Sequence, residues 1–162
     1  METVPQEHRP IEILFSYARE DEALRDELEK HLSTLKRSNR IVCWHDRHIR
    51  AGDTWSLEIS SHLDTADIIL LLVSANFLDS NYINAVEVKR ALERHKKGEA
   101  RVIPVILRRV DWTDETFAKL QALPRDADPV TEWPSRDAAF YDIAKEIKKV
   151  IVEMEKARGV GV

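Results

Sequence analysis

The sequence predicts a single α/β domain built on a parallel sheet with helices on both faces. Short apolar segments alternate with amphipathic helical segments along almost the whole chain. One of them, Ile68–Val73, is a run of six apolar residues, which is typical of a strand buried on both faces. Strict alternation with right-handed crossovers makes successive strands parallel. Five such strands predict the flavodoxin-like order 2-1-3-4-5, with ligand sites at the carboxyl edge of the sheet.

The predicted strands are short apolar runs bounded by polar residues. They are 11–16, 41–44, 68–73, 101–107 and 129–133. Pro104 has no amide hydrogen to give to a ladder, so we expect a bulge or an unpaired stretch in the fourth strand.

The predicted helices carry apolar stripes at helical spacing. They run from Asp21 to Leu35, from Asp53 or Thr54 past Ala66, from near Asn84 to near Gly98, and from Ser135 or Asp137 past Met154. Asp21 is predicted to cap the first of them. Residues 111–123 are expected to be irregular, with one short helix around Phe117 and Leu120. We expect a flexible N-terminus over 1–10, the domain over 11–156 and a flexible tail over 157–162.

Composition excludes several classes of protein. The 162 residues suit one core, and 43% hydrophobic with 33% charged residues is typical of a globular chain. A net charge of −4 argues against broad nucleic-acid binding. The single cysteine, Cys43, excludes an internal disulfide and is expected to be a buried inert thiol. No apolar run reaches membrane-spanning length, so we expect a cytoplasmic protein without a membrane segment.

Three segments, taken in order, resemble the TIR (Toll/interleukin-1 receptor) domain family, in the form found in bacteria. Ile13–Asp21 (ILFSYARED) resembles the opening box, a strand that ends in Phe-x-Ser-Tyr with an acid shortly after. His45–Trp55 resembles the second box, the BB loop, with its glycine at Gly52. Ile69–Leu78 resembles the third strand and the residues after it. Receptor-type members have Pro-Gly where this chain has Ala51-Gly52, and they carry a Phe-Trp box that this chain lacks.

The resemblance implies an enzyme that cleaves the nicotinamide–ribose bond of NAD+, with Glu87 as the catalytic carboxylate. Such a bond breaks through an oxocarbenium-like state, which a carboxylate beside the ribose stabilises. Nicotinamide is already a cationic leaving group, so one carboxylate suffices. From the local pattern alone, Asn84-x-x-Glu87 also matches a capping box, which would make Glu87 structural. Many enzymatic members have tryptophan at the position of Ile83, and here Tyr82 stands beside it.

The same resemblance, with the polar strand ends, suggests the residues that bind the substrate. They are Phe15, Ser16, Tyr17, Arg19, Asp46, Arg47, Gly52, Trp55, Ser74, Asn76, Tyr82 and Ile83. Several have a plain alternative: core packing for Phe15 and Trp55, turn chemistry for Ser74 and Asn76, a solvated charge for Arg19, and an exposed mobile loop for Arg47.

We expect no metal and no bound cofactor, with NAD+ as the substrate. His45-x-x-His48 lacks further ligands, and no glycine-rich dinucleotide loop is present. The expected partners are other copies of the chain, joined head-to-tail through the loop His45–Asp53, and a fused or associated sensor domain. Such a protein would serve as an effector in bacterial antiviral or stress defence, activated by assembly. A non-catalytic TIR scaffold is the alternative. A phosphoacceptor receiver domain is disfavoured, because the third strand ends in Val73-Ser74 rather than in aspartate.

Overall fold

The computed structural model describes residues 9–45 and 55–159 of the chain. Within them a four-stranded parallel sheet has the order β2-β1-β3-β4. Its strands are β1 (Ile11–Ser16), β2 (Ile41–Trp44), β3 (Ile68–Val73) and β4 (Arg101–Ile106). All four were predicted, and their order is the one predicted for strands 1 to 4. The α/β parallel fold is therefore confirmed.

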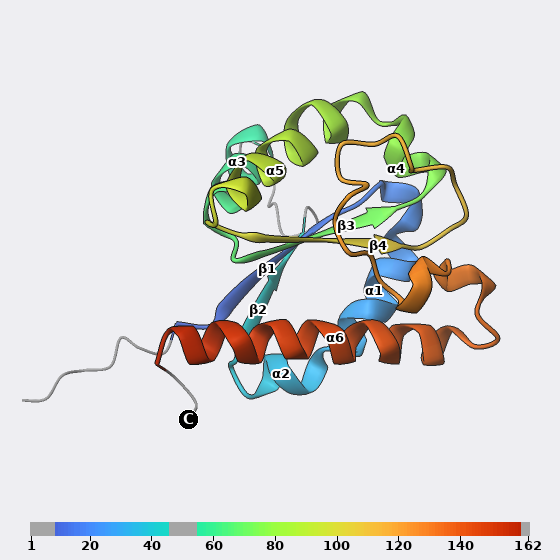
Figure 1. The fold of residues 1–162 in the computed structure, drawn as a ribbon. Coiled ribbons are helices and arrows are strands. Elements are labelled where there is room, and N and C mark those ends of the chain that lie inside the picture. Colours follow the sequence, from blue (N-terminus) through green and yellow to red (C-terminus); the bar gives the residue numbers. More distant parts are fainter. Residues whose placement is uncertain (1–8, 46–54, 160–162) are drawn as a thin grey trace, which may run out of the picture.

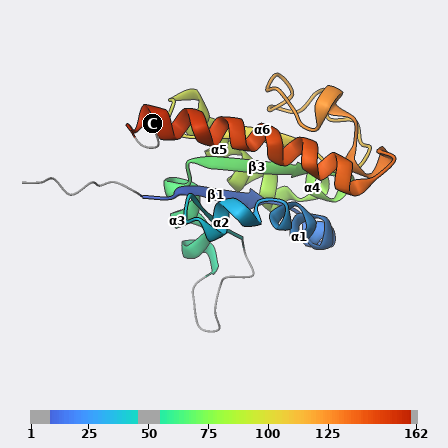
Figure 2. The ribbon, with the colours of Figure 1, turned by 90° about the horizontal axis from the view of Figure 1, so that it is seen from below.

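Helices cover both faces of this sheet (Figure 1). One face carries α3 (Trp55–Thr65), α4 (Ala75–Asp79), the π-helical turn η3 (Ile83–Val88) and α5 (Lys89–Lys96). The other carries α1 (Glu22–Lys30), α2 (Ser33–Arg37) and α6 (Arg136–Ala157). Figure 2 shows this second face from below, with α6 running lengthwise along it. None of the described helices is both long and apolar enough to cross a membrane.

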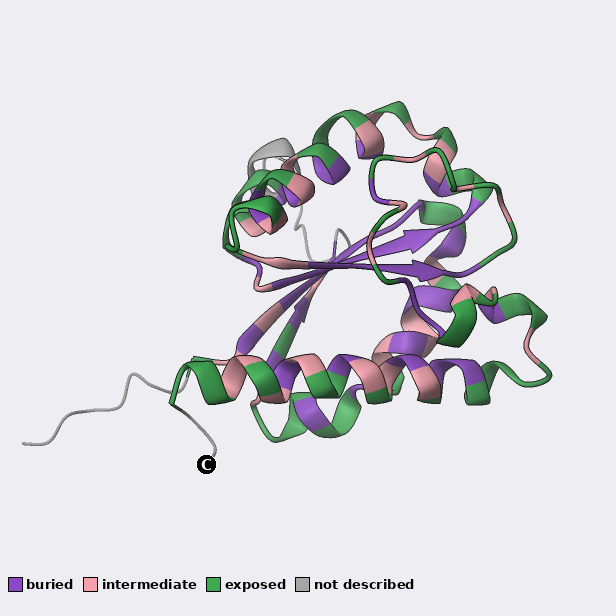
Figure 3. Ribbon diagram, viewed as in Figure 1, coloured by how far each residue is buried: buried purple, intermediate pink, exposed green. Residues whose placement is uncertain are grey.

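The core consists of two apolar layers, one on each side of the sheet. Every residue of β3 is buried, as expected for a central strand with helices on both faces (Figure 3). Along β1, Ile13 and Phe15 pack toward α1 and α6, whereas Leu14 packs toward α3 and α5. This alternation matters for the site, because Ser16 follows Leu14 on the same face.

Three expectations about helices were wrong in detail. The predicted helix from Asp21 to Leu35 is divided into the short turn η1 (Arg19–Asp21), α1 and α2. A short helix, α4, lies between β3 and the helix predicted from near Asn84, where no helix was predicted. Around Phe117 and Leu120 the chain forms turns rather than a helix.

The predicted fifth strand was also wrong. Residues 130–132 form a 3-10 turn, η5 (Val130–Glu132), whose Thr131 amide donates to the Leu107 carbonyl, beyond the end of β4. The outer edge of β4 is met instead by one residue, Leu123, which forms a parallel bridge with Val105. Pro104 lies in an unbroken ladder with β3, so the expected bulge is absent from it. Its carbonyl accepts from the Leu123 amide (2.9 Å) on the outer side, where a missing amide hydrogen costs no pairing with β3.

Candidate active site

Glu87 lies at the carboxyl edge of the sheet and is tied to the end of β1. Its carboxylate is buried, with 8% of the residue exposed. The hydroxyl of Ser16, the last residue of β1, donates to Glu87 Oε1 at 2.7 Å. Because Ser16 is itself buried, this bond is shielded from competition by water. The pair joins residues 71 positions apart and fixes the carboxylate beside the strand end.

The helical turn that carries Glu87 begins with a cap that does not involve Glu87. Ser80 Oγ accepts from the Ile83 amide at 3.1 Å. The side chain of Asn84 donates to three carbonyls at the end of the preceding helix: those of Phe77, Leu78 and Ser80. Asn84 therefore caps α4 rather than the turn of Glu87, and the capping-box interpretation is wrong. Glu87 sits within a π-helical turn, a local geometry often found at functional sites.

Tyr82 is the aromatic residue beside Glu87. Burial, reinforced by the negative charge of Glu87, raises the pKa of the Tyr82 phenol to about 12. The phenol is therefore neutral at physiological pH and can donate a hydrogen bond. Ile83, the next residue, is buried in the apolar layer with α3 and α5. The aromatic surface near the carboxylate thus comes from Tyr82.

A second polar cluster joins the strand ends of β1, β3 and β4. Asp21 is buried, with 1% of the residue exposed. The Ser74 hydroxyl donates to Asp21 Oδ2, and Arg108 Nε donates to Asp21 Oδ1 at 2.9 Å. Ser74 also caps α4, accepting from the Phe77 amide at 3.1 Å. Asp21 forms no side-chain cap of α1, contrary to expectation, although it lies at the positive end of that helix.

Sequence reasoning misses Arg108 and assigns Asp21 only a capping role. Two signals were available. An acid stands shortly after the first strand, and an arginine stands directly after the fourth. Because the carboxyl ends of parallel strands share one edge, these residues were candidates to meet.

Phe15 and Tyr17 face away from Glu87. They lie in the apolar layer with α1 and α6, opposite the face of Ser16. There the guanidinium carbon of Arg25 is 4.9 Å from the ring centre of Phe15 and 5.7 Å from that of Tyr17. The structure thus brings Ser16 to the carboxylate and places its two neighbours against a buried arginine.

The other predicted residues are more widely spread. Arg19 is exposed in η1, and Asn76 is exposed in the first turn of α4. Trp55 begins α3. Three predicted residues lie outside the described part of the chain: Asp46, Arg47 and Gly52. Their binding roles stay predictions.

A partly buried ionic network contacts His45, the first residue of the predicted BB loop. Glu29 accepts from Arg25 Nη1 at 2.6 Å and from Lys36, and its Oε1 lies 3.8 Å from His45 Nε2. Burial by itself would raise the pKa of Glu29, but the hydrogen bonds from Lys36 and Arg25 outweigh it and lower that pKa to about 2. Glu29 is therefore ionised at neutral pH, with the His45 ring beside its carboxylate.

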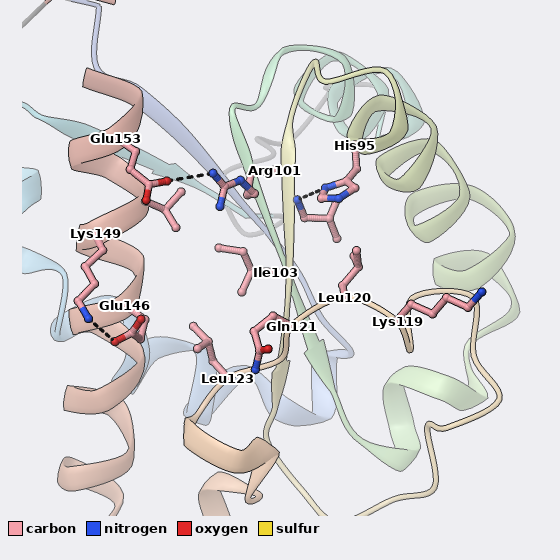
Figure 4. A pocket seen from close by; sticks show the side chains of 12 residues that line it. His95, Arg101, Ile103, Lys119, Leu120, Gln121, Leu123, Glu146, Lys149 and Glu153 are labelled. Atoms are coloured by element: carbon pink, nitrogen blue, oxygen red, sulfur yellow. Dashed lines mark hydrogen bonds and ion pairs between the residues drawn. The ribbon is translucent and has the colours of Figure 1, made fainter. Parts of the chain in front are cut away.

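A cavity of about 470 Å³ lies away from these clusters, at the amino-terminal half of β4 (Figure 4). Ile103, Leu120 and Leu123 line its apolar part, and an ion pair between Arg101 and Glu153 closes one side (3.1 Å). The cavity occupies the side of β4 where the predicted fifth strand is missing. It belongs to the sheet edge rather than to the site at Glu87.

The described residues contain no group of three or more His, Cys, Asp or Glu side chains able to hold a metal ion.

The TIR domain family model matches residues 13–140. An "Uncharacterized protein y4lF" from Sinorhizobium fredii (strain NBRC 101917 / NGR234) is 53% identical over 137 residues, covering 85% of this chain. The chain spans 42% of the length of that relative.

Two solved TIR domains share the fold at low sequence identity. The TIR domain of the Toll-related receptor TRR-2 from Hydra magnipapillata has a TM-score of 0.58 at 16% identity, covering 84% of this chain and 97% of its own. A chain of the RPS4 and RRS1 TIR domain heterodimer has a TM-score of 0.52 at 12% identity, covering 85% of this chain and 96% of its own. These likenesses concern the fold alone.

Proposed function

Because the chain belongs to the TIR domain family and holds a buried glutamate at the ligand edge of its sheet, we propose that it is an NAD+ glycohydrolase. Its products would be nicotinamide and ADP-ribose, in linear or cyclic form. The observation that supports this most is the Glu87 carboxylate, buried and fixed by the Ser16 hydroxyl at 2.7 Å. A glutamate with only a helix-capping role would not need a partner 71 residues away.

The proposed reaction breaks the bond between the nicotinamide nitrogen and ribose C1′. The bonding electron pair moves to the ring nitrogen, so neutral nicotinamide leaves and positive charge develops on the ribose. Glu87 stabilises that charge in a water-poor setting, where a fixed carboxylate acts more strongly than in bulk water. A water oxygen then attacks C1′ and loses a proton, or an adenine nitrogen attacks to give a cyclic product. Ser16 positions the carboxylate, and Tyr82 offers a ring and a neutral phenol nearby.

The test is release of nicotinamide from NAD+ by the purified chain, followed by liquid chromatography. Glu87→Gln and Glu87→Ala should lose activity by about 100-fold or more, the usual effect of removing one electrostatic stabiliser from a transition state. Glu93→Gln is the matched control, because Glu93 lies exposed on α5, the helix that continues from the turn of Glu87. Glu87 variants that turn over NAD+ as fast as the wild type would refute the assignment.

Self-association is the second part of the proposal, and a TIR pair that crystallised as a heterodimer supports it by analogy. We propose head-to-tail contacts through the loop His45–Asp53, which would close the site over the substrate. Specific activity should then rise with protein concentration, and Arg47→Glu or Arg50→Glu should blunt the rise. Activity strictly proportional to concentration, without assembly by light scattering, would contradict it. Assembly without any nicotinamide release would favour a non-catalytic scaffold instead.

The proposed setting is a cytoplasmic effector of bacterial antiviral or stress defence. The bacterial relative and its greater length support this, since 58% of that protein lies outside the matched stretch (100% minus the 42% covered) and has room for a sensor domain. Depletion of cellular NAD+ on expression, absent with Glu87→Gln, would be the corresponding test in cells.

A further inference from the structure

Arg108 has a guanidinium group that is oriented by a buried carboxylate yet remains half exposed. Its Nε donates to Asp21 Oδ1 at 2.9 Å, and 47% of its side chain is accessible to solvent, against none of the Asp21 side chain. Ser74 occupies the other oxygen of Asp21. Within the described part of the chain, the two terminal amino groups of Arg108 have no hydrogen-bond partner. Asp21 and Ser74 thus fix one edge of a guanidinium and leave its other donors for a ligand.

The next residue, Arg109, shows what a fully paired arginine looks like on this surface. Arg109 Nε and Nη2 donate to the two oxygens of Glu132 at 2.7 and 2.5 Å, in the two-bond geometry typical of an arginine–carboxylate pair. Its side chain is 78% exposed, and none of its contacts reaches the strand ends. The two adjacent arginines therefore differ in their pairing. Arg109 forms two hydrogen bonds with a surface glutamate, whereas Arg108 is held at its Nε by a buried carboxylate.

Arg108 lies at the same edge of the sheet as the Ser16–Glu87 pair. Ser16 is paired with Leu71 of β3, and the Leu107 amide donates to the carbonyl of Val73, two residues further along that strand. Leu71 is in turn paired with Pro104 of β4, four residues before Arg108, so two strand spacings and up to four residue rises separate the backbones of Ser16 and Arg108, roughly 16 Å at most. A ribose diphosphate held between the two side chains fits a gap of this size.

The exposed donors of Arg108 are chemically suited to a phosphate group. A guanidinium presents donors in a planar fork that matches phosphate oxygens, and a diphosphate offers several such oxygens at once.

We propose that Arg108, positioned by Asp21 and Ser74, binds the diphosphate group of a nucleoside diphosphate or dinucleotide. This inference deepens the proposed function, since it rests on NAD+ as the substrate and assigns a residue to its diphosphate. The bond to Asp21 orients the guanidinium before the ligand arrives, which lowers the ordering cost of binding.

The experiment measures binding without turnover, by calorimetry with ADP, ADP-ribose and adenosine. Arg108→Gln should weaken ADP and ADP-ribose about tenfold or more, the loss expected for one charge-assisted hydrogen bond, and leave adenosine unchanged. Arg109→Gln is the matched control and should bind all three ligands as the wild type does. Because Arg108→Gln leaves Asp21 buried without its cation, the pair Asp21→Asn with Arg108→Gln removes both charges and guards against misfolding.

Several results would overturn the inference. They are equal ADP binding by wild type and folded Arg108 variants, an equal loss of ADP and adenosine, and no ADP binding by the wild type at millimolar concentration. The proposed function can fail separately. If ADP-ribose binds through Arg108 but no nicotinamide is released, the diphosphate site stands and the proposed function fails. If Arg108→Gln releases nicotinamide at the wild-type rate, the diphosphate site fails and the proposed function stands.

Discussion

Replacing Ser16 by alanine removes the hydrogen bond that ties the end of β1 to Glu87. Ser16 is 1% exposed, and its hydroxyl donates to a buried carboxylate at 2.7 Å. A hydrogen bond to a charged group contributes about 1.5–3 kcal/mol to folding, against about 0.5–1.5 kcal/mol for a neutral one. Ser16→Ala should therefore lower the free energy of unfolding by about 1.5–3 kcal/mol, which corresponds to roughly 3–12 °C in Tm for a domain of this size.

A double-mutant cycle isolates the charged part of that bond. With Glu87→Gln as background the acceptor is a neutral amide, and the cost of Ser16→Ala should fall by about 1 kcal/mol. Urea unfolding at neutral pH, followed by far-ultraviolet circular dichroism, gives the four free energies. Ser38→Ala is the control, since Ser38 is an exposed serine whose hydroxyl meets only carbonyls of α2. Equal costs of Ser16→Ala in both backgrounds would refute the coupling between Ser16 and Glu87.

Three further predictions follow from perturbed ionisation. The folded pKa of Glu29 is about 2 against an ordinary 4.5, so its stabilisation, up to about 3 kcal/mol, is complete above pH 4.5 and is lost as the pH falls toward 2. The gap in unfolding free energy between wild type and Glu29→Gln should therefore shrink over that range, and a constant gap would contradict it. Ultraviolet titration should show the Tyr82 phenol ionising near pH 12, and at a lower pH in Glu87→Gln, where the neighbouring negative charge is gone. A titration curve unchanged by that substitution would show that the charge of Glu87 does not act on the phenol. Burial, with the charge of Glu29, raises the pKa of Cys43 to about 12, so Ellman's reagent at pH 8 should react only after unfolding, and rapid labelling of the native chain would oppose this.

The strands were predictable because burial on both faces leaves a local signal. Ile68–Val73 is apolar at every position, and its neighbours in the sheet are nearly so. The segment Pro129–Trp133 is less apolar, and it forms a turn because the outer edge of β4 is met by Leu123 and the Thr131 amide bonds beyond the strand end. Which segment reaches a sheet edge depends on the path of the whole chain, and local composition does not record it.

In the candidate site, too, the sequence indicated single residues but not their distant partners. Glu87 was identified from a family resemblance, and the structure adds its partner Ser16, which no local pattern links to it. Phe15 and Tyr17 were grouped with Ser16 because they adjoin it in sequence, although strand alternation sends them to the opposite face. Arg108 escaped notice because its meaning comes from Asp21, 87 positions away.

The rate of nicotinamide release from NAD+, measured for concentrated wild type, Ser16→Ala, Glu87→Gln and the double variant, tests the central claim most directly. If Glu87 is the catalytic carboxylate and Ser16 acts by positioning it, Glu87→Gln falls to the rate of buffer and Ser16→Ala is intermediate. Adding Ser16→Ala to Glu87→Gln then causes no further loss. Wild-type rates in folded Glu87→Gln, or no release by the wild type at any concentration, would contradict the claim.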